Sequence, residues 1–119
     1  MNSQRILLID KARDRKDRIN ALKSRGYAVF PTLNMEEARS RCMRGGYDLI
    51  VVNAGDEQEQ ATQYCDDIRR QCLRQLVLMC TNDGAGRDYA IAPDVDSLVN
   101  AVDSTLNASG KRDNLANAA

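Results

Sequence analysis

The 119-residue chain contains no histidine. Histidine is the side chain whose charge changes nearest to neutral pH, so its absence excludes histidine acid–base catalysis, histidine metal ligands and a phosphohistidine. Aromatic residues make up only 4% of the chain, too few for a platform that stacks the bases of single-stranded nucleic acid. Neither sign of charge predominates, because seventeen basic residues balance seventeen acidic ones. We therefore do not expect nucleic acid or an anionic membrane as a partner.

Long apolar runs and paired cysteines are also missing. No stretch reaches the length of a membrane-spanning helix, and the opening MNSQRILLID lacks the apolar core of a signal peptide. The four cysteines show no C-x-x-C spacing, which disfavours a zinc site: Cys42, Cys65, Cys72 and Cys80. We expect a cytoplasmic protein without a cofactor, in which the cysteines are reduced and pack as small apolar groups.

Short apolar runs alternate with amphipathic segments along the chain. The runs predict five strands, at residues 5–10, 27–30, 48–53, 76–81 and 89–92. The amphipathic segments predict helices at residues 14–25, 35–44, 58–73 and 93–106. This alternation predicts one α/β domain over residues 1–107, a doubly wound parallel sheet with helices on both faces. The tail at 108–119 has little apolar content and is expected to be disordered.

Three residues mark the ends of predicted elements. Gly26 is expected to end the first helix, because glycine readily adopts the left-handed conformation that follows a helix. Pro31 is expected to stop the second strand, since it has no N–H to donate to a ladder. Asn34 is expected to cap the second helix, with Glu37 completing a pattern like a capping box.

Polar residues follow three of the predicted strands. Asp10, Asn53 and Thr81 stand at the carboxyl ends of the first, third and fourth runs. In a doubly wound sheet, ligands bind at the carboxyl ends of the central strands. The sequence therefore predicts a polar site formed by these three side chains.

From Arg5 to Leu106 the sequence resembles the receiver domain of response regulators. The resemblance rests on the order and spacing of several motifs: ILLID, GYAVF, EEA, GGYDLIVVN, LVLMCT and YAIAP. It implies a flavodoxin-like fold with a five-stranded sheet. It also implies a site in which an acid pair binds magnesium and an aspartate ending the third strand is phosphorylated. A threonine or serine and a lysine complete that site.

Carried over residue by residue, the resemblance implies a vestigial site. Asp10 matches the first acid and Thr81 the hydroxyl residue. Lys11 stands in place of the second acid, Asn53 in place of the phospho-acceptor, and Ala92 in place of the lysine. An amide is too weak a nucleophile to form an acyl phosphate, and one remaining carboxylate is a poor ligand set for magnesium. We expect no catalytic residue and no metal site.

Two features of this site leave alternatives open. Lys11 either pairs with Asp10, taking the place of the metal's charge, or points to solvent as a flexible, strongly hydrated side chain. Another acid, such as Asp56 in the loop after the third strand, is a second candidate for phosphorylation.

The link between the fourth and fifth strands is short. Eleven residues separate Thr81 from Pro93, and YAIA must form the strand, which leaves NDGAGRD for the connection. A parallel crossover ordinarily takes a dozen residues or more, so the helix expected there is reduced or missing. Alternatively, the fifth strand pairs antiparallel. Gly84 and Gly86 do not have the G-x-G-x-x-G spacing of a phosphate-binding loop, and a plain connection is favoured.

A missing helix would leave apolar surface to be covered by a partner. We expect an interaction surface formed by the link, the fifth strand and the last helix: Gly84, Gly86, Tyr89, Leu98 and Val102. The segment from Lys11 to Arg25 carries seven basic and two acidic residues, and is either a docking face or a solvated helix face.

These features favour a phosphorylation-independent pseudo-receiver that acts in signal transduction through protein–protein contacts, with a homodimer as the default assembly. The alternatives are an active receiver, phosphorylated on another acid by a histidine kinase, and a module that binds a small ligand in the vestigial pocket.

Overall fold

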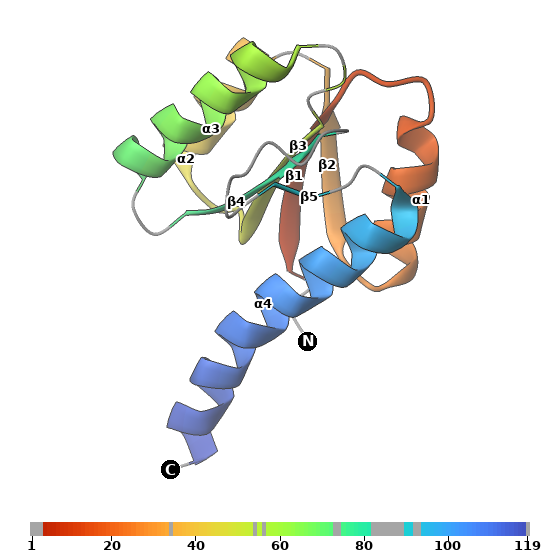
Figure 1. Ribbon diagram of the computed structural model, residues 1–119. Helices are drawn as coiled ribbons and strands as arrows, with labels where there is room; N and C mark the ends of the chain where they lie inside the picture. Colours follow the sequence, from red (N-terminus) through yellow and green to blue (C-terminus); the bar gives the residue numbers. More distant parts are fainter. Residues whose placement is uncertain are drawn as a thin grey trace.

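A computed structural model of the chain describes residues 4–33, 35–53, 55, 57–72, 75–81, 90–91 and 94–118. Five parallel strands form one sheet in the order β2-β1-β3-β4-β5 (Figure 1). The strands are β1 (Arg5–Asp10), β2 (Ala28–Thr32), β3 (Leu49–Asn53), β4 (Leu76–Cys80) and β5 (Ala90–Ile91). The predicted α/β fold with a doubly wound parallel sheet is confirmed.

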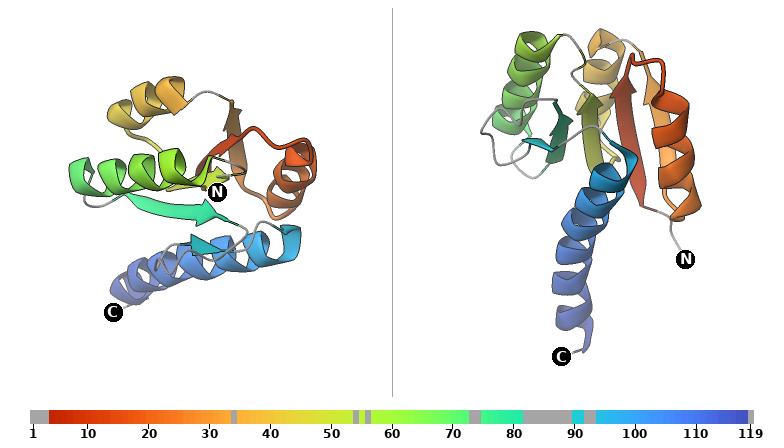
Figure 2. Two further views of the ribbon diagram at one scale, coloured as in Figure 1. Left: turned by 45° about the horizontal axis from the view of Figure 1, so that its top comes forward. Right: turned by 45° about the vertical axis from the view of Figure 1, so that its right-hand side comes forward.

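Four helices cover the two faces of this sheet. They are α1 (Arg15–Ser24), α2 (Met35–Arg44), α3 (Gln58–Gln71) and α4 (Val95–Ala118). Helices α2 and α3 cover one face, and α1 and α4 cover the other (Figure 2). No helix in the described part of the chain is long and apolar enough to cross a membrane.

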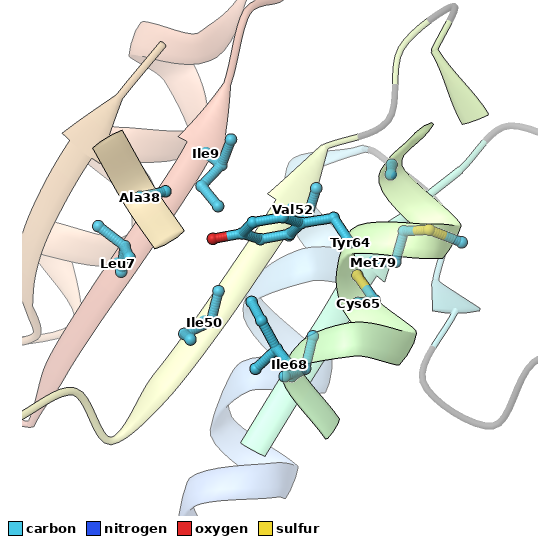
Figure 3. Close-up of a cluster of buried hydrophobic side chains, with 11 residues drawn as sticks. Leu7, Ile9, Ala38, Ile50, Val52, Tyr64, Cys65, Ile68 and Met79 are labelled. Atoms are coloured by element: carbon cyan, nitrogen blue, oxygen red, sulfur yellow. The ribbon is translucent and has the colours of Figure 1, made fainter. Parts of the chain in front are cut away.

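The strands are buried on both faces, which explains why they appear in the sequence as continuous apolar runs. In β1, Leu7 and Ile9 point toward α2 and α3, into the cluster shown in Figure 3. The alternate residues Ile6 and Leu8 point toward α1 and α4. All four are at most 1% exposed, so a shift of one residue in register would exchange two complete hydrophobic sets.

The fifth strand is short but its direction is clear. Met79 pairs with Ala90 and Cys80 with Ile91 in parallel register, so the antiparallel alternative is wrong. Thr81 extends the pairing, because its N–H donates to the carbonyl of Ile91 at 2.9 Å. The link at 82–89, and with it the expected loss of a helix, lies outside the described residues.

The second strand does not stop at Pro31. It continues to Thr32, and Pro31 is an exposed residue in register with Leu8. The predicted stop is wrong because β2 lies at the edge of the sheet. An edge strand has one side without a neighbour, and there the missing N–H of a proline costs little.

The apolar stripe of α4 packs inside the domain. Leu98 and Val102 are fully buried and Leu106 is 1% exposed, all in the cluster shared with α1. Their predicted place on an exposed interaction surface is therefore corrected: they cover the sheet of their own chain.

The backbone of α4 remains helical through Ala118, where the sequence led us to expect disorder, and its C-terminal end extends beyond the sheet (Figure 1). Such an extension needs only local backbone hydrogen bonds, which low apolar content does not prevent. The domain boundary at residue 107 stays a prediction.

Candidate functional site

The polar site lies where β1, β3 and β4 end. Asp10 and Asn53 are register partners, and so are Asn53 and Cys80, the residue before Thr81. The Asn53 amide Nδ2 donates to Asp10 Oδ1 at 3.0 Å. Asp10 and Thr81 are 2% and 3% exposed. The structure thus brings the three predicted strand-end residues to one edge of the sheet.

The principal partner of Asp10 is Arg18, in the second turn of α1. Arg18 Nε donates to Asp10 Oδ2 at 2.5 Å, and Nη2 donates to Asp10 Oδ1 at 3.1 Å. Two parallel N–H bonds to one carboxylate form the strongest geometry available to an arginine. Arg18 is 1% exposed, so both charges of this pair are shielded from water.

The same guanidinium also holds Asp14, at the start of α1. Nη2 donates to Asp14 Oδ1 at 2.7 Å and Nη1 to Asp14 Oδ2 at 2.9 Å. The hydrogen bond from Arg18 lowers the pKa of Asp14. Burial alone would lower the pKa of Arg18, but the hydrogen bonds from Arg18 to Asp10 and Asp14 outweigh it and raise that pKa further above its ordinary range. Asp14 and Arg18 are therefore charged at neutral pH.

Two further donors from neighbouring residues contact the Oδ1 atom of Asp10. The backbone N–H of Ala12 donates to Oδ1 at 3.0 Å, in addition to the bonds from Arg18 and Asn53. Asn53 is itself held in place, because its Oδ1 accepts the N–H of Gly55 at 3.3 Å. The amide therefore directs its NH₂ group toward Asp10 and its oxygen away from it.

Lys11 does not enter this site. Its Nζ lies 3.5 Å from Glu57 Oε2, and the two side chains are about half exposed. The second alternative for Lys11, a side chain at the surface, describes the structure. Exposed pairs of this kind contribute little to stability, so the link it makes between the β1–α1 loop and the start of α3 is weak.

Several residues of the predicted site lie outside the described residues: Asp56, Gly84, Gly86, Tyr89 and Ala92. Their roles stay predictions. Within the described part of the chain, no group of three or more cysteine, aspartate or glutamate side chains is arranged to hold a metal ion.

Arg18 is the functional residue that our reading of the sequence missed. In the sequence, Arg18 stands only within the basic segment from Lys11 to Arg25, as part of either a docking face or a solvated helix face. Asp14, Arg18 and Leu22 follow one another at four-residue spacing, which places them on one row of α1. Because Leu22 is apolar and faces the core, this row signals that Arg18 is directed inward too.

A depression lies between α2 and α3, the two helices that cover one face of the sheet. Its volume is about 260 Å³, and Glu36, Arg39, Gln60, Gln63, Tyr64 and Asp67 line it. Arg39 lies over the ring of Tyr64, 5.9 Å from its centroid, and its Nη2 lies 3.7 Å from Asp67 Oδ2. Arg39 and Asp67 in this depression are thus paired with each other.

Two solved structures have this arrangement of helices and strands. A response regulator from Thermotoga maritima matches with a TM-score of 0.60 at 22% identity, over 85% of this chain and 77% of that one. An orphan response regulator of H. pylori matches with a TM-score of 0.70 at 22% identity, over 86% and 95% of the two chains. The chain has the fold of a response-regulator receiver domain. No protein-family model and no curated protein sequence matches it.

In the receiver fold, the strand ends just described are the position that the sequence resemblance assigns to magnesium and the phosphoryl group. The residues present here do not fit that metal. Magnesium requires several oxygen ligands in near-octahedral geometry. Asp10, the one matched acid, already accepts four hydrogen bonds, two of them from a guanidinium. Asn53 presents N–H groups rather than an oxygen to the same point.

Proposed function

We propose that the chain is a phosphorylation-independent pseudo-receiver, which acts in signal transduction through contacts with other proteins. One observation carries the proposal. At the acceptor position, Asn53 donates to Asp10, and the charge of Asp10 is already compensated by Arg18. The likeness of the fold to two response regulators supports a role in signalling. We place this module in the cytoplasm and assign it no enzymatic activity.

Phosphoryl transfer to this site lacks both a nucleophile and the means to stabilise charge. An amide does not replace a carboxylate as nucleophile. Asp10 is the nearest carboxylate, but both of its oxygens are engaged and the residue is 2% exposed. A phosphoryl group brought to Asp10 would have to break the buried pair between Asp10 and Arg18, which is costly.

A module without a chemical trigger still presents a constant surface. We propose that its partner, or a second copy of the chain, binds near the short link that follows β4, beside the outer face of α4. That face differs from the buried stripe, since Asp96 and Asn100 are exposed. A pseudo-receiver of this kind signals by its abundance or location rather than by its phosphorylation.

The first prediction concerns phosphorylation itself. The chain is incubated with acetyl phosphate and magnesium, and intact mass is measured, with a competent receiver domain treated in parallel as the control. We expect no added phosphoryl mass. We expect the Asn53→Asp variant to gain little, because Arg18 still compensates Asp10 and the second acid of the pair is still absent.

A phosphorylated parent chain would contradict the proposal. Peptide mapping would then identify the modified acid, and modification at Asp56 would establish the alternative of an active receiver that uses another carboxylate.

A further inference from the structure

We infer that Arg18 is a built-in replacement for a divalent cation, which neutralises the strand-end site permanently and closes it to metals. This inference deepens the proposed function and concerns the same site. It rests on where the guanidinium lies, on its burial and on the orientation of Asn53.

The guanidinium occupies the point at which two carboxylates converge. A single atom, Nη2 of Arg18, lies 3.1 Å from Asp10 Oδ1 and 2.7 Å from Asp14 Oδ1. Two carboxylate oxygens that approach one point would make a site for a hard cation if that point were vacant. Here that point is occupied by Nη2 of Arg18, which is covalently part of α1.

The burial of the pair makes the replacement permanent. Arg18 and Asp10 are 1% and 2% exposed, and an arginine is not deprotonated in proteins. A metal bound from solution comes and goes with its concentration, whereas this positive charge is present whenever α1 is folded. The bond to Asp14, whose side chain is 62% exposed, adds a second anchor near the surface.

The orientation of Asn53 agrees with a site whose charge is already balanced. Its NH₂ group faces Asp10 at 3.0 Å, and its oxygen accepts from Gly55. A bound metal would repel the NH₂ group and attract the amide oxygen. The amide is therefore oriented to donate a hydrogen bond to Asp10 rather than to coordinate a metal.

Three variants test this inference, with melting temperature measured against Mn²⁺ concentration in buffers of matched ionic strength. Arg18→Met keeps most of the apolar stem of the side chain and removes its charged guanidinium. Asp10→Asn combined with Arg18→Met removes both charges of the buried pair. Arg15→Met is the matched control, because Arg15 lies on the same helix, is partly buried and, among the described residues, its side chain donates to the backbone carbonyl of Ala12 and to no carboxylate.

We expect the parent chain and Arg15→Met to melt at temperatures that do not depend on Mn²⁺. Arg18→Met leaves Asp10 buried without a counter-charge, so its melting temperature should fall by about 10 °C or more and recover as Mn²⁺ is added. The double variant should be more stable than Arg18→Met and should not respond to Mn²⁺. Electron paramagnetic resonance of free Mn²⁺ should show binding to Arg18→Met alone.

Several outcomes would overturn the inference. One is Mn²⁺ binding to the parent chain that is lost in the double variant. A second is an Arg18→Met variant whose melting temperature equals that of the parent chain. A third is an Arg18→Met variant whose folding and melting temperature do not respond to added Mn²⁺, although the double variant folds. All measurements use unphosphorylated protein, so phosphorylation of the parent chain would refute the proposed function without changing this result.

Discussion

At the scale of single residues, burial determines which side chains of this chain can react. Cys65 and Cys80 are fully buried, and Cys80 is the register partner of Asn53 beside the polar site. Burial disfavours the thiolate and raises the pKa of each thiol to about 12. Because the thiolate is the nucleophile, these two cysteines are unreactive at neutral pH. They act as small apolar groups, as their spacing had suggested.

We therefore predict selective alkylation of the native chain at pH 8. Iodoacetamide should modify the half-buried Cys72 well before Cys65 and Cys80, and peptide mapping over time would measure the order. In denaturant all three should react at similar rates. Rapid modification of Cys80 in the folded chain would show that the strand ends open to solvent.

At the scale of elements, a polar cluster fixes α4 to the corner between α1 and β2. The Tyr27 hydroxyl donates to Asp103 Oδ1 at 2.5 Å, and Arg25 pairs with the same carboxylate. Burial and the hydrogen bond to Asp103 raise the pKa of Tyr27 to about 12. Burial alone would raise the pKa of Asp103, but the bonds from Tyr27 and Arg25 outweigh it and lower that pKa. Both groups thus favour the state in which the phenol donates to a carboxylate.

Removing this hydroxyl should loosen α4. Tyr27→Phe is expected to lower the free energy of unfolding by about 1.5–3 kcal/mol, the net value of a hydrogen bond to a charged group. Tyr47→Phe is the matched control, since the Tyr47 hydroxyl has no hydrogen-bond partner among the described residues. Urea denaturation followed by circular dichroism would measure both. An equal loss in the two variants would contradict the assigned role of Tyr27.

The pH dependence of this difference has a definite sign. The folded pKa of Tyr27 is raised, so its contribution is complete below the unfolded pKa of about 10 and is lost as the pH rises through about 12. The folded pKa of Asp103 is lowered, so its contribution is lost as the pH falls below the ordinary range of aspartate. The difference between Tyr27→Phe and the parent chain should accordingly be largest between these limits.

At the scale of the whole molecule, α1 and α4 share one face of the sheet, and the end of α4 extends beyond it (Figure 2). The apolar stripe of α4 is buried within the chain, so a partner that binds this helix contacts its outer face. That outer face is polar, with Asn100 exposed near the N-terminal end of the helix. Association there would resemble a transient interface, polar and modest in area.

We predict that the chain self-associates through this face. Asn100→Arg places a charge on it and should weaken association, because a charge buried at an interface without a partner is costly. Asn20→Arg makes the same change at an exposed residue of α1, away from the face, and serves as the matched control. Light scattering over a range of concentrations would measure the mass.

If the parent chain is monomeric at high concentration, the prediction of self-association is wrong. If both variants weaken association equally, the α4 face is not the interface.

The sequence by itself determined the elements and their order in this protein. Continuous apolar runs specify parallel strands that are buried on both faces, and the amphipathic segments between them, which repeat with the period of a helix, specify the covering helices. The proximity of Asp10 and Asn53 followed from the same source, since parallel strands end at the same edge of the sheet. The chemistry of Asn53 also needed no structure, because an amide is a poor nucleophile in any environment.

Only the tertiary structure decided which side chains are buried and what they contact. Pro31 remains in β2 because that strand lies at the edge, and Leu98 and Val102 are core residues because α4 packs on the sheet. Arg18, and not Lys11, which directly follows Asp10 in the sequence, compensates Asp10, because α1 directs Arg18 inward whereas Lys11 lies at the surface in the loop before the helix. Burial and pairing depend on the docking of elements that are distant in the sequence, which local periodicity does not specify.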